Sequence, residues 1–270
     1  MQEEVNLFGG THGPVIRIGD TVRREPRPST STVQCLLRHL ERAGFDGAPR
    51  ALGYDEQGRE ILGFIPGEVV GQGDGGPPPA YLRAESTLVD LARLLHRYHD
   101  ATAGFVPPPD AIWSFQTGAP RAGEVICHND IGPWNTVFRN GRPHAFIDFD
   151  TAAPGSREWD VAYALYRFIP FIPDEVCIRF AGWSAPPDRP ARLRLFCEAY
   201  GLEASSDIGA VIARRIEVMI ATGMTLNAAG DPRYGQQWRQ VMKPRLLRDL
   251  DFVVRSSGVG EAAYGWTPRR

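Results

Sequence analysis

A polar segment that follows an apolar run carries the residues whose types could do chemistry. His128, Asp130 and Asn135 stand in the order His-x-Asp-x-x-x-x-Asn. A further carboxylate, Asp148, ends the next apolar run. Transfer of a phosphoryl group from ATP needs one carboxylate to orient or deprotonate the attacking hydroxyl, and an amide and a second carboxylate to hold Mg²⁺ against the phosphates. The four residues therefore predict phosphoryl-transfer chemistry.

Short strands are predicted to position these groups. Residues 124–127 have the pattern of a strand, and Ile131-Gly132-Pro133 disfavours a helix, so the motif should lie on a loop. Residues 136–139 and 143–147 are predicted to pair through an Asn-Gly turn. Asn135 and Asp148 then lie at the same end of an antiparallel pair, where both can reach one metal ion. The alternative is that the polar residues of the segment only form turns.

The segment resembles the aminoglycoside phosphotransferase family, which includes relatives of choline kinase. The family loop is followed by Ile-Asp-Trp/Phe-Glu/Asp, a glycine and Asp-x-Ala, and this chain has Ile147-Asp148-Phe149-Asp150, Gly155 and Asp160-Val161-Ala162. The resemblance is strong from about Val125 to Tyr166 and weaker elsewhere. It is nearest to a bacterial branch that includes trifolitoxin-immunity-like proteins.

The resemblance implies an α+β, two-lobed protein-kinase-like fold. Residues 1–67 would form an N-terminal nucleotide-binding lobe with an antiparallel sheet, and residues 68–270 a mainly helical catalytic and substrate-binding lobe. It also implies ATP and Mg²⁺ as cofactors. Asp130 would receive or orient the hydroxyl proton, and His128 would brace the loop. Asn135 and Asp148 would bind Mg²⁺ through oxygen. Asp160 would support the structure, either by accepting hydrogen bonds from the loop backbone or by capping the following helix. Asp150 would lie near the metal.

The nucleotide site is predicted from the first part of the chain. A glycine-rich turn between two strands, with Gly9, Gly10 and Gly13, would let backbone N–H groups approach phosphate oxygens. The segment from Phe64 and Ile65 to Gly67 would contact adenine, as the hinge of the resembled fold does. The same glycines also suit an ordinary hairpin.

Two positions depart from the family pattern. The strand that should carry a phosphate-contacting lysine has Arg23 and Arg24, and strand alternation favours Arg24. Arginine keeps the charge but differs from lysine in reach. The first predicted helix lacks an early glutamate to pair with this residue, having Gln34 early and Glu41 late.

Composition narrows the class of protein. The 270 residues carry a formal net charge of −2, which gives no reason to expect nucleic-acid or anionic-membrane binding. No apolar run is long enough to span a bilayer and no signal peptide is evident, so we expect a cytoplasmic protein. The four cysteines are scattered without Cys-x-x-Cys spacing, so we expect neither a zinc site nor a disulfide. The expected partner is a hydroxylated small molecule, and the chain is expected to act as a monomer or homodimer.

Helices are predicted elsewhere in the chain, over residues 32–43, 82–102, 161–168, 191–200, 207–224 and 232–254. The substrate is not specified by this pattern. Aminoglycosides are polycations, yet the carboxylates of the helical part are matched by arginines; they include Asp174, Glu175, Glu198, Glu217 and Asp231.

Two other functions would also use residues of this pattern. The departures at Arg24 and Gln34 suit a non-catalytic protein of an immunity or sequestration type, which would bind a nucleotide or another ligand without turnover. A metal-dependent hydrolase would use His128, Asp130, His144 and Asp148, but it would leave Asn135 unexplained.

Overall fold

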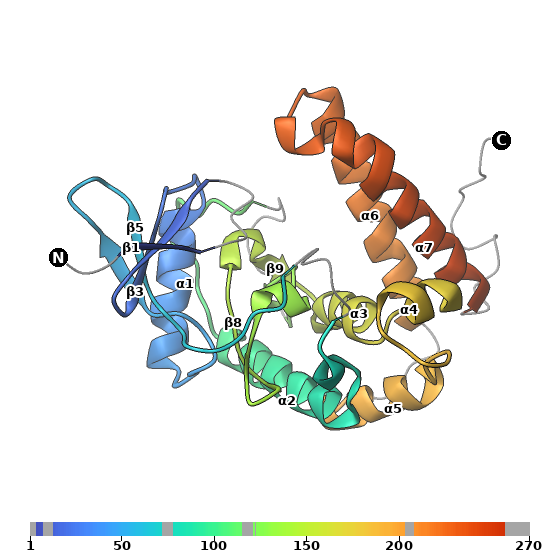
Figure 1. Ribbon diagram of the computed structural model, residues 1–270. Helices are drawn as coiled ribbons and strands as arrows, with labels where there is room; N and C mark the ends of the chain where they lie inside the picture. The colour runs from blue at the N-terminus through green and yellow to red at the C-terminus, as the bar shows by residue number, and fades with distance from the viewer. Residues whose placement is uncertain are drawn as a thin grey trace.

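A five-stranded antiparallel sheet forms one end of the computed structural model (Figure 1). The structure describes residues 4–7, 13–71, 78–114, 121, 123–202 and 208–256. The strand order is β1-β2-β3-β5-β4. The strands are β1 (Glu4–Leu7), β2 (Val15–Ile18), β3 (Thr21–Arg24), β4 (Ala51–Tyr54) and β5 (Glu60–Gly63). All neighbouring strands pair antiparallel, so the antiparallel sheet expected in this part of the chain is confirmed.

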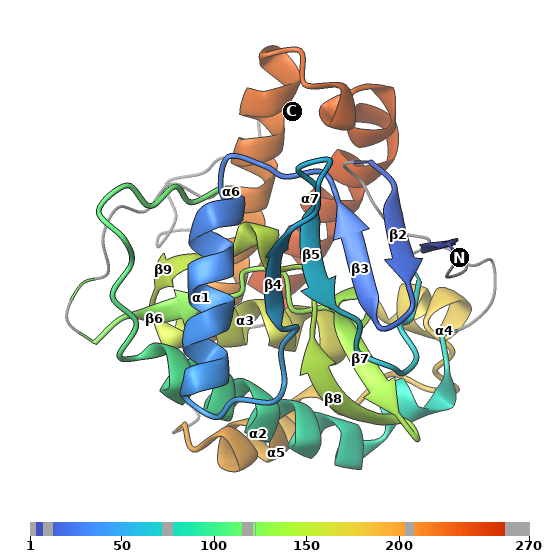
Figure 2. The same ribbon diagram turned by 90° about the vertical axis from the view of Figure 1, so that its left-hand side faces the viewer.

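Helix α1 (Thr30–Arg42) packs beside this sheet (Figure 2). Its apolar residues recur on one face, and Val33, Leu36, Leu37 and Leu40 are buried. The helix is followed by Gly44 with φ 75°, a left-handed conformation that glycine adopts without strain. The same helix also contacts α2 (Glu85–Thr102), so it joins the sheet to the helical part of the molecule.

Two small antiparallel pairs lie between the sheet and the helices. Strand β6 (Val125–Cys127) pairs with β9 (Ala153–Gly155), and β7 (Thr136–Arg139) pairs with β8 (Arg142–Phe146). Three short 3₁₀ turns accompany these elements, at Ala80–Arg83, Pro133–Asn135 and Phe149–Thr151. The segment after β5 reaches this region, because Glu68 and Phe138 exchange backbone hydrogen bonds of 2.8 and 2.7 Å.

The remaining helices build the rest of the molecule (Figure 1). They are α3 (Arg157–Phe168), α4 (Asp174–Phe180), α5 (Arg189–Tyr200), α6 (Ile208–Ala228) and α7 (Lys243–Ser256). Helices α6 and α7 lie antiparallel and pack on each other. Among the described residues, no helix has both the length and the apolar character needed to cross a membrane.

Some predicted boundaries were wrong. The single helix expected over residues 232–254 is instead a 3₁₀ turn at Pro232–Tyr234, a π-helical turn at Trp238–Met242 and then α7. Trp238 explains part of the difference, since its ring packs directly on the backbone of Gly223 in α6, where a Cβ atom would come within 2.3 Å of it. Strand β9 and helix α4 were not predicted.

Candidate active site

Asp160, in the first turn of α3, fixes the loop that follows β6. Its buried carboxylate accepts hydrogen bonds from the backbone N–H groups of His128 (2.7 Å) and Asn129 (2.8 Å). His99 on α2 approaches the same carboxylate at 3.1 Å. Burial opposes ionisation of Asp160, but the hydrogen bonds from His99 and from the backbone of His128 outweigh it and lower the pKa of Asp160. The supporting role predicted for Asp160 is confirmed by these contacts.

His128 is buried within this loop and faces the backbone. Its Nε2 lies 3.0 Å from the carbonyl oxygen of Ile147, and the Asp130 N–H donates to its Nδ1 at 3.4 Å. These contacts assign the Nε2–H tautomer, because the carbonyl can only accept. His128 thus ties the loop to the residue before Asp148, and its ring is engaged in holding the backbone.

Asp130 is held by side chains from two elements. Asn135 Nδ2 donates to Asp130 Oδ2 at 2.9 Å and Trp134 Nε1 donates to the same oxygen at 3.4 Å. The Tyr163 hydroxyl of α3 donates to Oδ1 at 2.6 Å. Burial and the negative charge of Asp130 raise the pKa of Tyr163, so this hydroxyl keeps its proton near neutral pH. Arg167, one turn further along α3, donates to the Tyr163 oxygen at 3.1 Å.

Tyr163 and Arg167 were missed from the sequence. Tyr163 stands three residues after Asp160 and Arg167 four residues after Tyr163, so helical spacing places all three on neighbouring turns of α3. The loop fixed by Asp160 therefore lies over the same helix. Asp160-x-x-Tyr163 was the available signal, but only the packing of the loop shows that Tyr163 reaches Asp130.

Asn135 and Asp148 lie at one end of the β7–β8 pair, as predicted. The Ile147 N–H donates to the Asn135 carbonyl at 2.9 Å, which places Asp148 directly beyond that bond. Asp148 has a left-handed backbone with φ 62° and ψ 64°, and its side chain is 44% exposed. The hairpin therefore brings a buried amide and a partly exposed carboxylate to the same end.

Arg24 of β3 reaches this end of the hairpin from the sheet. Its guanidinium contacts Glu60 at 2.5 Å, Asp150 at 2.8 Å and Asp148 at 3.2 Å. Burial lowers the pKa of Arg24, but the carboxylates of Asp150, Glu60 and Asp148 outweigh it and raise the pKa overall. Arg27 forms a second ion pair with Asp150. Burial and repulsion from Asp148 raise the pKa of Asp150.

Arg23, the other candidate for the lysine position, lies elsewhere. Its guanidinium is 3.7 Å from Asp55, in the turn between β4 and β5. The alternation of side chains along β3 sends neighbouring residues to opposite faces. Of the two arginines, Arg24 is the one that the structure brings to Asp148.

The other residues predicted for nucleotide binding are placed around the sheet. Phe64 donates its N–H to the Asp20 carbonyl at 2.9 Å, and the Arg17 guanidinium lies 3.8 Å from the centre of its ring. Ile65 follows and is half-buried. Gly13 is exposed with φ 123°. Gly9 and Gly10 lie outside the described residues. Within the described part of the chain, Gly13, Phe64 and Ile65 make no hydrogen bond or ion pair with Asp130 or Asp148.

The donor set at the end of the hairpin suits a hard cation. Amide and carboxylate oxygens from Asn135, Asp148 and Asp150 are ligands that Mg²⁺ prefers, and that ion retains several waters when bound. In this structure the positive charge between the two carboxylates is supplied by Arg24. His144 lies apart, lining a hollow with Asp46, Asp90 and Arg142. The described residues contain no group of three His, Cys, Asp or Glu side chains arranged to hold a metal.

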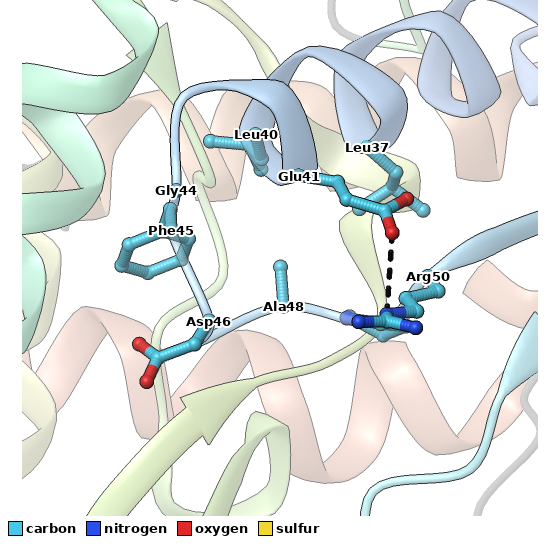
Figure 3. Close-up of a pocket in the computed structure, with 9 residues that line it drawn as sticks. Leu37, Leu40, Glu41, Gly44, Phe45, Asp46, Ala48 and Arg50 are labelled. Atoms are coloured by element: carbon cyan, nitrogen blue, oxygen red, sulfur yellow. Dashed lines mark ion pairs between the residues drawn. The ribbon is translucent and has the colours of Figure 1, made fainter.

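A cavity of about 290 Å³ lies between the last turns of α1 and the segment 44–50 that follows it, away from this site (Figure 3). Leu37, Leu40 and Phe45 supply apolar walls. On its rim Glu41 pairs with Arg50 at 3.3 Å. Glu41, the late helix glutamate noted in the sequence, is therefore engaged with Arg50.

Comparisons with known proteins identify relatives of this chain. Residues 111–196 match the model of the "Phosphotransferase enzyme family". The trifolitoxin immunity protein of Rhizobium leguminosarum bv. trifolii is 38% identical over 206 residues, which cover 75% of this chain and 76% of that protein.

Solved structures share the fold at low sequence identity. A choline/ethanolamine kinase family protein from Mesorhizobium loti superposes with a TM-score of 0.57, 16% identity, and coverage of 93% of this chain and 92% of that one. The APH(2")-IIa structure with streptomycin and ATP gives a TM-score of 0.52 at 13% identity, covering 86% and 90%. The predicted α+β, kinase-like fold is thereby confirmed.

Proposed function

The chain belongs to the phosphotransferase enzyme family, and on that premise we propose that it transfers the γ-phosphate of ATP to a hydroxyl group of a small molecule. The observation that carries the proposal is the meeting of Asp130, Asn135 and Asp148 at one end of a hairpin, opposite Arg24. These are a carboxylate for the acceptor hydroxyl, two oxygen donors for a cation, and a positive charge for phosphate.

Asp130 has the catalytic role in this proposal. Its carboxylate orients the acceptor hydroxyl and receives the proton as the oxygen–phosphorus bond forms and the bond to the leaving ADP oxygen breaks. Asn135 and Tyr163 hold that carboxylate in place through hydrogen bonds of 2.9 and 2.6 Å. His128 supports the loop through the backbone of Ile147.

Asn135 and Asp148 would hold Mg²⁺, with Asp150 beside them. When bound, the cation neutralises charge on the phosphates and fixes their orientation. The amide nitrogen of Asn135 is committed to Asp130, so its oxygen is the atom that faces a cation.

The nucleotide would lie between the two proposed lobes, residues 1–67 and 68–270. Arg24 would contact phosphate oxygens, the turn with Gly9, Gly10 and Gly13 would cover them, and Phe64 and Ile65 would contact adenine. The complex of APH(2")-IIa with streptomycin and ATP supports a nucleotide site in this fold. We place the reaction in the cytoplasm and assign no oligomeric state beyond a monomer or homodimer.

The acceptor is proposed to be a hydroxylated molecule of low positive charge. Trp134 and Tyr163 contact Asp130, and Arg167 lies over both of their rings at 5.0 and 4.9 Å. Carboxylates that would attract a polycation are paired elsewhere: Asp174 with Arg189, and Glu217 with Arg214. An arginine beside the catalytic carboxylate disfavours polycationic acceptors.

The test is ADP formation by Asp130→Ala against a panel of hydroxylated metabolites. An acceptor that supports turnover in the wild type should lose it at least about 100-fold in the variant, because general-base contributions are of that size. ATP affinity should be retained. Asp251→Ala, which removes an exposed carboxylate of α7, serves as the matched control. Full activity in Asp130→Ala would contradict the proposed function.

A second candidate function is ligand binding without turnover. It is favoured by the ion pairs that Arg24 makes with Asp148 and Asp150, which occupy the proposed cation ligands, and by the name of the immunity protein relative. This alternative predicts that Asp130→Asn leaves ligand binding and any protective effect in cells unchanged, and that no acceptor yields ADP.

A further inference from the structure

Glu60 is a fully buried carboxylate placed directly opposite Arg24. Strands β3 and β5 are antiparallel neighbours, and their register pairs Arg24 with Glu60. Arg24 Nε donates to Glu60 Oε2 at 2.5 Å, while the Glu60 side chain has no exposed surface. Directly opposed residues on one face of a sheet are close enough for their side chains to interact. The sheet itself therefore brings the two charges together.

The other oxygen of Glu60 is held from α1. Gln34 Nε2 donates to Glu60 Oε1 at 2.9 Å, and Gln34 is itself buried. Arg38 donates to the Gln34 oxygen at 3.2 Å. Both oxygens of Glu60 thus have assigned donors, one from a strand and one from the helix. The late glutamate of this helix, Glu41, instead pairs with Arg50 (Figure 3).

The bond to Nε determines where the rest of the guanidinium points. With Nε committed to Glu60, the two terminal nitrogens face the hairpin, where Nη1 is 3.2 Å from Asp148 and Nη2 is 2.8 Å from Asp150. A guanidinium is a rigid planar fork, so fixing one edge fixes the direction of the other two nitrogens. Glu60 therefore directs Arg24 toward the carboxylates of the proposed cation site.

We propose that Glu60 is the positioning residue that holds Arg24 for nucleotide phosphate. In the family pattern this role belongs to a glutamate on the first helix. This inference rests on the proposed function, because it presupposes that Arg24 contacts phosphate. In protein kinases the basic residue pairs with a glutamate on a helix, and movement of that helix controls the pair. Here both partners belong to one sheet, and α1 contributes only the neutral amide of Gln34, which holds the second oxygen of Glu60.

The experiment compares ATP affinity by calorimetry, in the presence of Mg²⁺, for four purified proteins. They are the wild type, Glu60→Gln, the exchanged double variant Gln34→Glu/Glu60→Gln, and the control Glu41→Gln. Glu60→Gln should bind ATP at least about 10-fold more weakly, as expected for loss of a charge-assisted hydrogen bond. The double variant restores one carboxylate and one amide at the same two positions, so it should regain most of that affinity. Glu41→Gln should bind as the wild type does.

Recovery in the double variant separates positioning from a merely structural role, since two changes in a buried pair would otherwise weaken the fold further. If Glu60→Gln fails to fold, Gln34→Leu supplies the test. It removes only the amide that fixes Glu60, and it should weaken ATP binding by about 3-fold or more.

Each failure has a distinct meaning. A folded Glu60→Gln protein that binds ATP within 2-fold of the wild type would overturn the role of Glu60 while leaving the proposed function intact. If Glu60→Gln does not fold, unchanged binding by Gln34→Leu would do the same. A wild-type protein that binds no nucleotide would overturn the proposed function and this inference with it.

Discussion

At the scale of single residues, three side chains hold the carboxylate of Asp130 in place by donating hydrogen bonds to it. Asn135 and Trp134 come from its own loop, but Tyr163 comes from α3 and is anchored in turn by Arg167. A catalytic carboxylate gains from such fixation, because a small displacement of the base slows proton transfer strongly. Removal of the Tyr163 hydroxyl takes one hydrogen bond from Asp130 and one acceptor from Arg167.

We predict that Tyr163→Phe lowers turnover by about 10-fold without changing ATP affinity, because it removes one hydrogen bond from Asp130 and leaves the nucleotide contacts intact. Steady-state kinetics with an acceptor found in the metabolite screen provide the measurement. Tyr166→Phe is the matched control, since the Tyr166 hydroxyl donates to Asp249 at 2.7 Å and not to Asp130. Equal turnover in Tyr163→Phe and wild type would show that Asp130 is held well enough by its own loop.

At the scale of secondary-structure elements, a chain of hydrogen bonds between three side chains joins three helices to the catalytic loop. The Tyr200 hydroxyl of α5 donates to Nδ1 of His99 on α2 at 2.6 Å, and Nε2 of His99 faces Asp160 of α3 at 3.1 Å. Asp160 then holds the backbone of His128 and Asn129. Burial lowers the pKa of His99, and Asp160 offsets this only in part. The imidazole is therefore neutral in the folded protein near pH 7.

This arrangement predicts a loss of stability on mild acidification. The pKa of His99 is lower in the folded than in the unfolded protein, so the unfolded state binds more protons as the pH falls below about 6.5. The contribution of His99 to the free energy of unfolding is fully present above that pH, and it declines as the pH drops toward the folded-state pKa of His99. The free energy of unfolding, measured by urea titration at several pH values, should depend less steeply on pH below about 6.5 in His99→Gln than in the wild type.

A second variant is needed because His144 also lowers the stability of the folded protein as the pH falls. Burial and the charge of Arg139 lower the pKa of His144 as well. His144→Gln is therefore the matched variant. The assignment to His99 would be contradicted if the pH dependence of the free energy of unfolding were unchanged in His99→Gln but lost in His144→Gln.

The connection between sheet and catalytic hairpin depends on Gly67. A Cβ atom at this position, where φ is 153°, would lie 2.4 Å from Val137 Cγ1 and 2.6 Å from the Phe138 carbonyl oxygen. Gly67→Ala should destabilise the protein by about 1–3 kcal/mol, the usual range for overpacking, as measured by urea unfolding. Gly104→Ala meets no atom within 4 Å and should be nearly neutral. Equal stability of the two variants would show that residue 67 shifts without strain.

At the scale of the whole molecule, the catalytic hairpin and its loop could be predicted because their contacts are local. Asn135 and Asp148 are joined by one turn, and the Asn-Gly signal fixes which ends meet. The partners of Arg24 and Asp130 could not be predicted, because Glu60 and Tyr163 reach them through strand pairing and packing across long stretches of chain. A missing helix glutamate was visible in the sequence, but its replacement from a neighbouring strand was not.

Figures 1 and 2 show the sheet, whose strand β3 carries Arg24, beside the helical part of the molecule. We propose that ATP binds between the sheet and the loop that carries Asp130. The measurement that tests this most directly is isothermal titration calorimetry of the purified protein with ATP, with and without Mg²⁺. We predict metal-dependent binding with a Kd of about 1 μM to 1 mM, the range of typical enzyme–substrate affinities. Absence of binding to any nucleotide would contradict the account and leave the catalytic loop as a scaffold for ligand sequestration.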